Sequence, residues 1–64
     1  MFVVNFTPLH WASMNGHLSV VEYLVNQKAD INGKAENGST PLHYADRYRY
    51  LNVVEFLKNN GAAF

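Results

Sequence analysis

Three histidines are the side chains best suited to bind a metal ion or move a proton. His10 and His43 follow identical Thr-Pro-Leu triplets 33 residues apart, and His17 stands beside a glycine. If each triplet opens one layer of a repeated structure, the two equivalent imidazoles lie roughly 10 Å apart. Ligands of one zinc ion each lie about 2.0–2.1 Å from it. We therefore expect His10 and His43 to hydrogen-bond their own threonines and nearby backbone, His17 to be structural, and no metal site.

The remaining reactive side chains do not form a catalytic set. Cysteine is absent, which excludes thiol catalysis and thiolate ligands. No serine follows the pattern of a nucleophile elbow, and no glycine-rich phosphate loop precedes a helix. The carboxylates are scattered, at Glu22, Asp30, Glu36, Asp46 and Glu55. The sequence thus predicts a protein that is not an enzyme and needs no cofactor.

The segment Arg47-Tyr48-Arg49-Tyr50 has the composition of a recognition site. Arginine and tyrosine are frequent in protein–protein hot spots. Arginines among tyrosines also suit nucleic acid, by phosphate contact and base stacking. In a third interpretation Tyr50 packs in the place of His17 while both arginines are only solvated. Five basic and five acidic residues give a net charge of zero, which argues against a nucleic-acid or membrane partner.

The elements that must position these residues belong to a sequence repeat that occurs twice. At an offset of 33, twelve of the 25 pairs from Thr7/Thr40 to Ile31/Phe64 are identical, and Trp11/Tyr44 and Tyr23/Phe56 exchange one aromatic ring for another. In each unit a threonine can cap a helix whose first position is proline. Gly16 then suits the left-handed residue after a helix end. Apolar residues predict a second helix from about Leu18 to Gln27.

Several motifs fall in one phase of this period: Thr7-Pro8-Leu9-His10, Asn15-Gly16-His17-Leu18, Val20-Val21-Glu22-Tyr23-Leu24 and Ala29-Asp30-Ile31-Asn32. With the 33-residue period they resemble the ankyrin repeat over residues 7–64. The resemblance implies an all-α repeat solenoid, in which two helix-turn-helix units are joined by a projecting hairpin or turn at residues 32–39. It also implies a protein-interaction scaffold.

Four positions depart from the family pattern. Lys28 replaces the usual glycine after the second helix, and Arg49 stands where the first unit has Gly16. If the backbone at Arg49 keeps a positive φ, the side chain costs about 1 kcal/mol. Ala35 replaces an aspartate that often orders the hairpin, which predicts a looser turn. Lys58 replaces Val25 of the first unit, which predicts a solvated outer face of the second repeat.

The whole chain is predicted to be one ankyrin-repeat segment: residues 1–6 are a partial preceding hairpin, 7–39 repeat 1 and 40–64 a truncated repeat 2. Stacked repeats need about three units for stability. The apolar ends therefore predict a neighbour: further repeats of a longer array, a second copy, or a partner; a free-standing monomer is the alternative. No secretory signal or membrane helix is recognisable, so we expect an intracellular, cytoplasmic protein.

The leading functional hypothesis is a non-catalytic module that binds an unidentified protein partner. In repeats of this kind, targets contact hairpin tips and the exposed face of the first helix. The matching positions are Met14, Asn15, Glu36, Asn37, Ser39, Arg47 and Tyr48. Trp11 and Tyr44 are expected on the helix-packing face, and either becomes an anchor if exposed. The alternative is a structural spacer within a longer ankyrin solenoid, with no target of its own.

Overall fold

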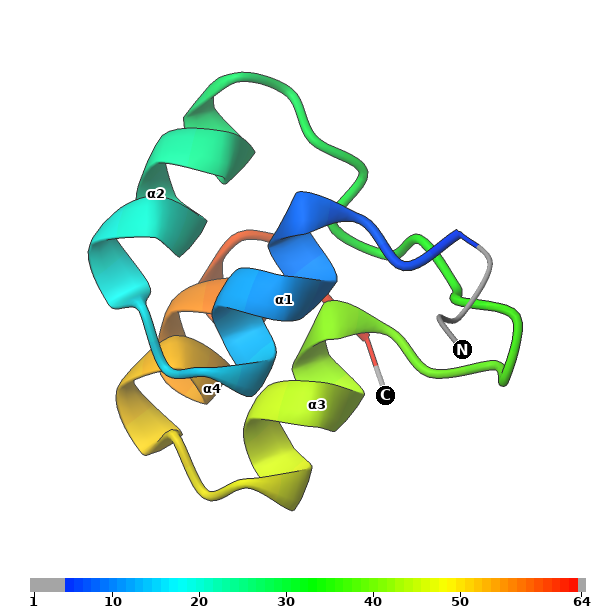
Figure 1. Cartoon of the computed structure of the whole chain (residues 1–64). Coiled ribbons are helices and arrows are strands. Elements are labelled where there is room, and N and C mark those ends of the chain that lie inside the picture. The colour runs from blue at the N-terminus through cyan, green and yellow to red at the C-terminus, as the bar shows by residue number, and fades with distance from the viewer. Residues whose placement is uncertain (1–4, 64) are drawn as a thin grey trace.

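The computed structural model describes residues 5–63, which contain four helices and no strand. The helices are α1 (Pro8–Met14), α2 (Leu18–Asn26), α3 (Pro41–Arg47) and α4 (Leu51–Asn59). Each repeat contributes one seven-residue helix followed by one nine-residue helix (Figure 1). The all-α repeat architecture expected from the sequence is therefore confirmed. The Met1–Val4 part of the predicted preceding hairpin and Phe64 lie outside the described residues.

Both first helices begin with the same reciprocal cap. The Thr7 side chain accepts a hydrogen bond from the backbone N–H of His10, and the His10 ring accepts one from the backbone N–H of Thr7. Thr40 and His43 repeat this arrangement at α3. Two backbone donors that a helix start leaves unpaired are thereby satisfied. The predicted caps are confirmed.

The turns that end the helices use left-handed backbone conformations. Gly16 after α1 has φ 71°, and its counterpart Arg49 after α3 has φ 66°. Lys28 after α2 has φ 71°. The same turn geometry therefore recurs whether or not glycine occupies it, so Arg49 and Lys28 hold strained conformations because the fold requires them.

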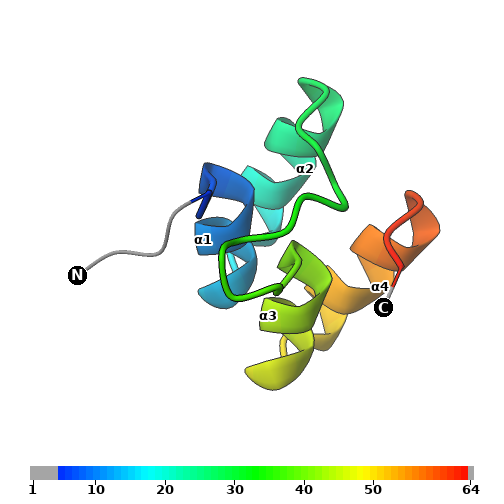
Figure 2. The same cartoon turned by 90° about the vertical axis from the view of Figure 1, so that its right-hand side faces the viewer.

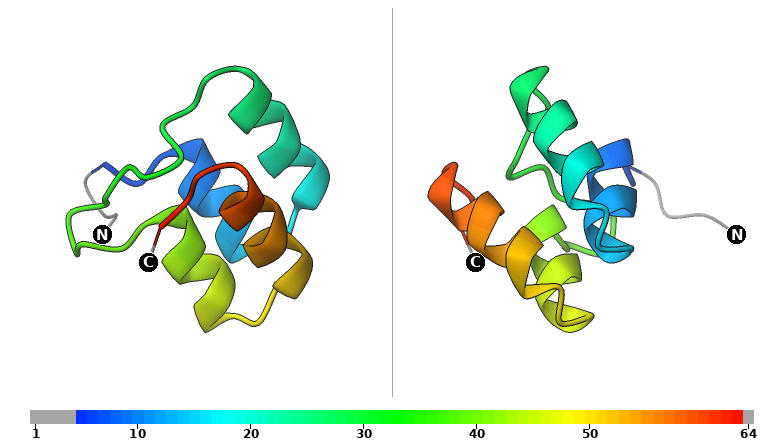
Figure 3. Two further views of the ribbon diagram at one scale, coloured as in Figure 1. Left: turned by 180° about the vertical axis from the view of Figure 1, so that it is seen from behind. Right: turned by 90° about the vertical axis from the view of Figure 1, so that its left-hand side faces the viewer.

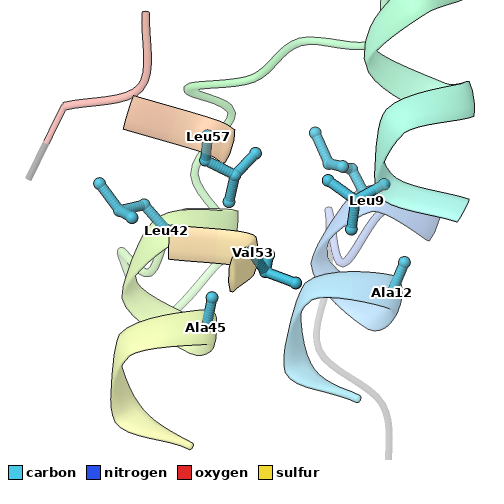
Figure 4. Packing of buried hydrophobic residues seen from close by; sticks show 7 residues of the cluster. Leu9, Ala12, Leu42, Ala45, Val53 and Leu57 are labelled. Carbon is cyan, nitrogen blue, oxygen red and sulfur yellow. The ribbon is translucent and has the colours of Figure 1, made fainter. Parts of the chain in front are cut away.

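The core lies where the two units meet. Helix α1 packs against α3, and α2 against α4 (Figures 2 and 3). Leu9 and Ala12 of α1 lie close to Leu42 and Ala45 of α3 and to Val53 of α4 (Figure 4). The fully buried apolar residues are Leu9, Ala12, Val21, Leu42, Ala45, Val53 and Leu57. Each unit thus buries its apolar residues largely against the other, as expected of layers in a stack.

The connection between α2 and α3 is a series of turns that projects beyond the helices (Figure 1). The backbone N–H of Ala35 donates to the carbonyl of Ser39 at 2.9 Å, and that of Gly38 donates to the carbonyl of Ala35 at 2.8 Å. Ala35 is itself buried. The turn is therefore closed by its own backbone and packed at its base, although it lacks the aspartate whose absence predicted a looser hairpin.

One asparagine connects the two repeats beyond the apolar core. The Asn32 side-chain amide donates to the carbonyl of Gly61 at 3.1 Å, and its oxygen accepts from the backbone N–H of Ala63 at 3.0 Å. The end of repeat 1 is thereby fastened to the segment after α4. None of the helices in the described part of the chain is long and apolar enough to cross a membrane.

Candidate functional site

Tyr44 is the centre around which the candidate surface is built. Its ring is 5% exposed and contacts Phe6 and His10 edge-on, with ring centroids 5.5 and 5.8 Å away. Its hydroxyl accepts a hydrogen bond from the Asn37 side-chain amide at 3.0 Å. One buried ring therefore joins α3, α1, the segment before α1 and the connecting turn.

Arg47 lies over this ring. Its guanidinium carbon is 5.3 Å from the centre of the Tyr44 ring, a cation–π arrangement, and Nη2 is 3.4 Å from the Ser39 hydroxyl. Positions 44 and 47 share a helix face, and helical side chains lean toward the N-terminus, which lets Arg47 reach back to Ser39. Among the described residues Arg47 forms no ion pair. Most of its N–H donors are thus left for other acceptors.

Tyr48 lies next to Arg47, four residues after Tyr44, at the end of α3. Its side chain is 50% exposed. A large, rigid aromatic side chain beside a positioned guanidinium is the combination frequent in protein–protein hot spots. Arg47 and Tyr48 are both exposed where the sequence analysis placed its candidate contacts.

The connecting turn contributes two exposed residues and one that the prediction misplaced. Glu36 and Asn37 are exposed. The side chain of Asn37 makes two hydrogen bonds: its amide donates to the Tyr44 hydroxyl, and its oxygen accepts from the Ser39 backbone N–H at 3.0 Å. Ser39 was expected to be exposed on the turn but is only 7% exposed. The expectation of an accessible Ser39 is wrong because this residue lies beneath Arg47 and leads into the α3 cap. Its hydroxyl orients Arg47 instead.

Repeat 1 offers the equivalent positions on α1. Met14 is half-buried, whereas Asn15 is exposed and donates its side-chain amide to the Trp11 carbonyl at 2.9 Å. Trp11 is 47% exposed and contacts the His17 ring, with centroids 5.1 Å apart. Trp11 is therefore exposed, which was the condition for it to act as an anchor for a partner, whereas its counterpart Tyr44 is buried.

The capping histidine His10 is fully buried, and both of its ring nitrogens have hydrogen-bond partners. Its Nδ1 accepts from Thr7, and its Nε2 lies 2.9 Å from the Gly33 carbonyl and 3.1 Å from the Ser39 carbonyl. These partners place the proton on Nε2. The expected hydrogen bonds of His10 to Thr7 and nearby backbone are confirmed. Within residues 5–63, no three histidine, cysteine or acidic side chains gather as a metal site.

A family model described as "Ankyrin repeats (3 copies)" matches residues 3–64. The chain belongs to the ankyrin repeat family. Ankyrin repeats generally mediate protein–protein interaction and are generally non-catalytic. The exposed side chains of Trp11, Arg47 and Tyr48 are of the types frequent in protein–protein contacts.

Individual relatives match over about the length of one ankyrin repeat. "Palmitoyltransferase AKR1" of Naumovozyma castellii and that of Saccharomyces cerevisiae are each 58% identical over 31 residues, which is 48% of this chain and 4% of each relative. "Alpha-latrocrustotoxin-Lt1a" of Latrodectus tredecimguttatus is 52% identical over 31 residues, 48% of this chain and 2% of the toxin. The chain thus spans a small fraction of these relatives, and the likeness concerns the repeat.

Phe6 is a residue of the candidate surface that the sequence analysis did not indicate. Phe6 is half-buried and stacks on the His10 ring, with centroids 5.6 Å apart, as well as contacting Tyr44. The available signal was the repeat itself, because Phe6 occupies the position equivalent to Ser39. An aromatic ring where the second unit has serine indicates that this position of repeat 1 fills space next to the following repeat.

Proposed function

We propose that this ankyrin segment is a non-catalytic module that binds a protein partner through its connecting turn and the exposed end of α3. Arg47 and Tyr48 are the central contacts, with Glu36 and Asn37 on the turn and Met14 and Asn15 on the equivalent part of α1. The observation that carries the proposal is the preorganisation of Arg47 over the buried Tyr44 ring. A guanidinium held in one place loses less side-chain entropy when a partner binds it.

The surroundings of Arg47 favour a partner that presents a carboxylate. The guanidinium has no carboxylate partner within residues 5–63, and a planar guanidinium binds carboxylates through two parallel hydrogen bonds. Tyr48 offers apolar contact area beside it. A partner with an acidic side chain next to an apolar one would satisfy both. Nucleic acid is not proposed, since the net charge is zero.

The test compares two double variants that each remove one charged side chain and one tyrosine. Arg47→Ala with Tyr48→Ala removes the proposed contacts. Glu22→Ala with Tyr23→Ala removes an exposed charge and an exposed tyrosine from α2. Proteins captured by the wild-type chain are identified by mass spectrometry, purified and titrated against all three chains. Far-UV circular dichroism checks that each chain is folded.

We expect the Arg47/Tyr48 variant to lose binding, with folding retained, and the Glu22/Tyr23 variant to bind like wild type. Arg47→Lys should weaken binding, because an ammonium group cannot make the bidentate contact. Undiminished binding by the folded Arg47/Tyr48 variant would refute the proposed surface.

A second candidate function, a spacer within a longer solenoid, is favoured by the unequal burial of equivalent residues. Pro41, Tyr44 and Val53 of repeat 2 are buried against repeat 1, whereas Pro8, Trp11 and Val20 of repeat 1 are exposed. The face of repeat 1 that points away from repeat 2 therefore has the composition of a face that another layer covers.

The spacer predicts no target of its own. Adding ankyrin repeats before residue 5 should then protect Trp11 from solvent, seen as a blue shift of its fluorescence, without changing any binding. If the Arg47/Tyr48 variant loses a purified partner while Trp11 remains accessible in the extended chain, the spacer function is rejected.

A further inference from the structure

Every glycine of the chain follows an asparagine: the pairs are Asn15-Gly16, Asn32-Gly33, Asn37-Gly38 and Asn60-Gly61. In such a pair the glycine nitrogen can attack the asparagine side-chain carbonyl carbon, because no Cβ on the following residue hinders the approach. Asparagine is for this reason a chemically labile residue. The structure restrains the four pairs very differently, and this difference selects one of them.

Two of the asparagines are held at both ends of the side chain. Asn37 donates to the Tyr44 hydroxyl and accepts from the Ser39 N–H, while the Gly38 N–H is engaged by the Ala35 carbonyl at 2.8 Å. Asn32 donates to the Gly61 carbonyl and accepts from the Ala63 N–H. Rotating either side chain toward the following nitrogen breaks hydrogen bonds to other segments.

The other two asparagines cap helices and are held at one end only. Asn15 and Asn60 each donate the side-chain amide to the carbonyl four residues back, at 2.9 and 2.8 Å. Neither side-chain oxygen has a hydrogen-bond partner among the described residues. The N–H groups of Gly16 and Gly61 make only long local bonds, of 3.4 and 3.2 Å. When the glycine nitrogen attacks the side-chain carbonyl carbon, Asn15 and Asn60 therefore each give up one side-chain hydrogen bond, whereas Asn32 and Asn37 each give up two.

The side chain of Tyr50 makes the surroundings of these two Asn-Gly pairs different. A Cβ built on Gly16 would lie 2.6 Å from Cε1 of the Tyr50 ring, so this ring covers the Asn15-Gly16 turn. The corresponding position on Gly61 has nothing within 4 Å, and both Asn60 and Gly61 are exposed. The Asn60-Gly61 pair is thus not covered by an aromatic ring as Asn15-Gly16 is.

We propose that Asn60 is a site of spontaneous covalent modification in the folded protein. The Gly61 nitrogen forms a bond to Cγ of Asn60, the bond from Cγ to the side-chain nitrogen breaks, and ammonia leaves with the proton from the Gly61 N–H. One water then adds to either carbonyl of the cyclic imide. The products are aspartate or, with the backbone rerouted through the side chain, isoaspartate at position 60. Each adds one negative charge.

The equivalent positions of repeat 1 indicate that Asn60 and Gly61 would stay exposed if a further repeat packed against repeat 2. Gln27 and Lys28 occupy the positions equivalent to Asn60 and Gly61, and both are exposed although repeat 2 packs against repeat 1. Gln27 also provides an internal control, because its longer side chain would have to close a six-membered ring onto the nitrogen of a non-glycine residue.

The modification has a consequence at a distance along the chain. Isoaspartate lengthens the backbone between residue 60 and Gly61, whose carbonyl accepts the Asn32 amide. Moving this carbonyl frees one end of the Asn32 side chain. Asn32-Gly33 should therefore become the second site, after Asn60 has reacted. The proposal is independent of partner binding by Arg47.

The experiment incubates the chain in mildly alkaline buffer prepared with heavy-oxygen water and locates the incorporated label by peptide mass spectrometry. A sample denatured in urea gives the reactivity of the four pairs without the fold, and circular dichroism monitors the native sample. An osmolyte such as sucrose keeps the native sample folded if the helical signal falls. Asn60→Gln and Tyr50→Ala are the variants.

In the native chain we expect label first at Asn60, then at Asn15 and Asn32, and last at Asn37, with a flatter ranking in urea. Asn60→Gln should slow labelling at Asn32, and Tyr50→Ala should accelerate it at Asn15. Label at Asn37 or Asn32 before Asn60, or the same ranking in native and denatured samples, would overturn the proposal. If Tyr50→Ala fails to fold, the wild-type ranking still decides.

Discussion

Replacing Arg49 by glycine should stabilise the fold. Arg49 has φ 66°, a conformation that costs a residue with a Cβ about 1–2 kcal/mol. Its side chain is exposed and makes no hydrogen bond, ion pair or ring contact with the described residues, so its removal breaks none of these. Glycine gives back about 0.4–1 kcal/mol, because the unfolded chain gains freedom. The net expectation is a stabilisation of about 0.5–1 kcal/mol.

The assay is urea unfolding followed by circular dichroism. With an m-value near 1 kcal/mol/M, the midpoint of Arg49→Gly should rise by about 0.5–1 M at unchanged m. The thermal midpoint should rise by roughly 2–8 °C. The control is Gln27→Gly, since Gln27 likewise lies at the end of a helix, as the C-cap of α2, but has φ −88°. This control gains no strain relief and should lose about 0.4–1 kcal/mol. A neutral or destabilising Arg49→Gly would refute the assignment of strain to this turn.

Two further substitutions test the packing. Leu57→Ala should cost about 2–5 kcal/mol, because Leu57 is fully buried, whereas Leu51→Ala, with a side chain 68% exposed, should stay within about 0.5 kcal/mol. Equal losses in urea unfolding would mean that Leu51 is buried in solution and would contradict the packing described here. Ser13→Ala should stabilise by about 1–3 kcal/mol, because the buried Ser13 hydroxyl has no hydrogen-bond partner among the described residues. The exposed Ser19→Ala provides its control, and a loss of stability in Ser13→Ala would indicate a bound water at that hydroxyl.

The sequence was sufficient for those features that depend on local hydrogen bonding and backbone conformation. The Thr-Pro-Leu-His motif predicted both helix starts. The 33-residue offset aligned Arg49 with Gly16 and raised the condition of a positive φ there, which the structure meets with φ 66°. These features are determined within a few residues of one another, so a repeated motif reproduces them.

Features that depend on the neighbouring layer were not predictable from equivalent positions. Trp11 and Tyr44 share one phase of the repeat, yet only Tyr44 is buried, because repeat 1 covers that side of repeat 2 whereas nothing in residues 5–63 covers the same side of repeat 1. Ser39 belongs to a polar turn, yet it is buried, with its carbonyl next to the His10 ring and its hydroxyl next to Arg47. These two neighbours lie 29 and 8 residues away along the chain, and composition carries no signal of them.

The His10 ring has a consequence for how this surface could diversify. The ring of His10, on α1, lies within hydrogen-bond distance of the carbonyls of Gly33 and Ser39, near the two ends of the connecting turn. The support of the turn therefore does not depend on the side chain at its tip, Glu36. If the turn contacts a partner as proposed, substitutions of Glu36 would change that contact at little cost in stability, whereas a substitution of His10 would loosen both ends of the turn at once. Variation is thus tolerated best at Glu36, and less well at Asn37, which bonds Tyr44 and Ser39.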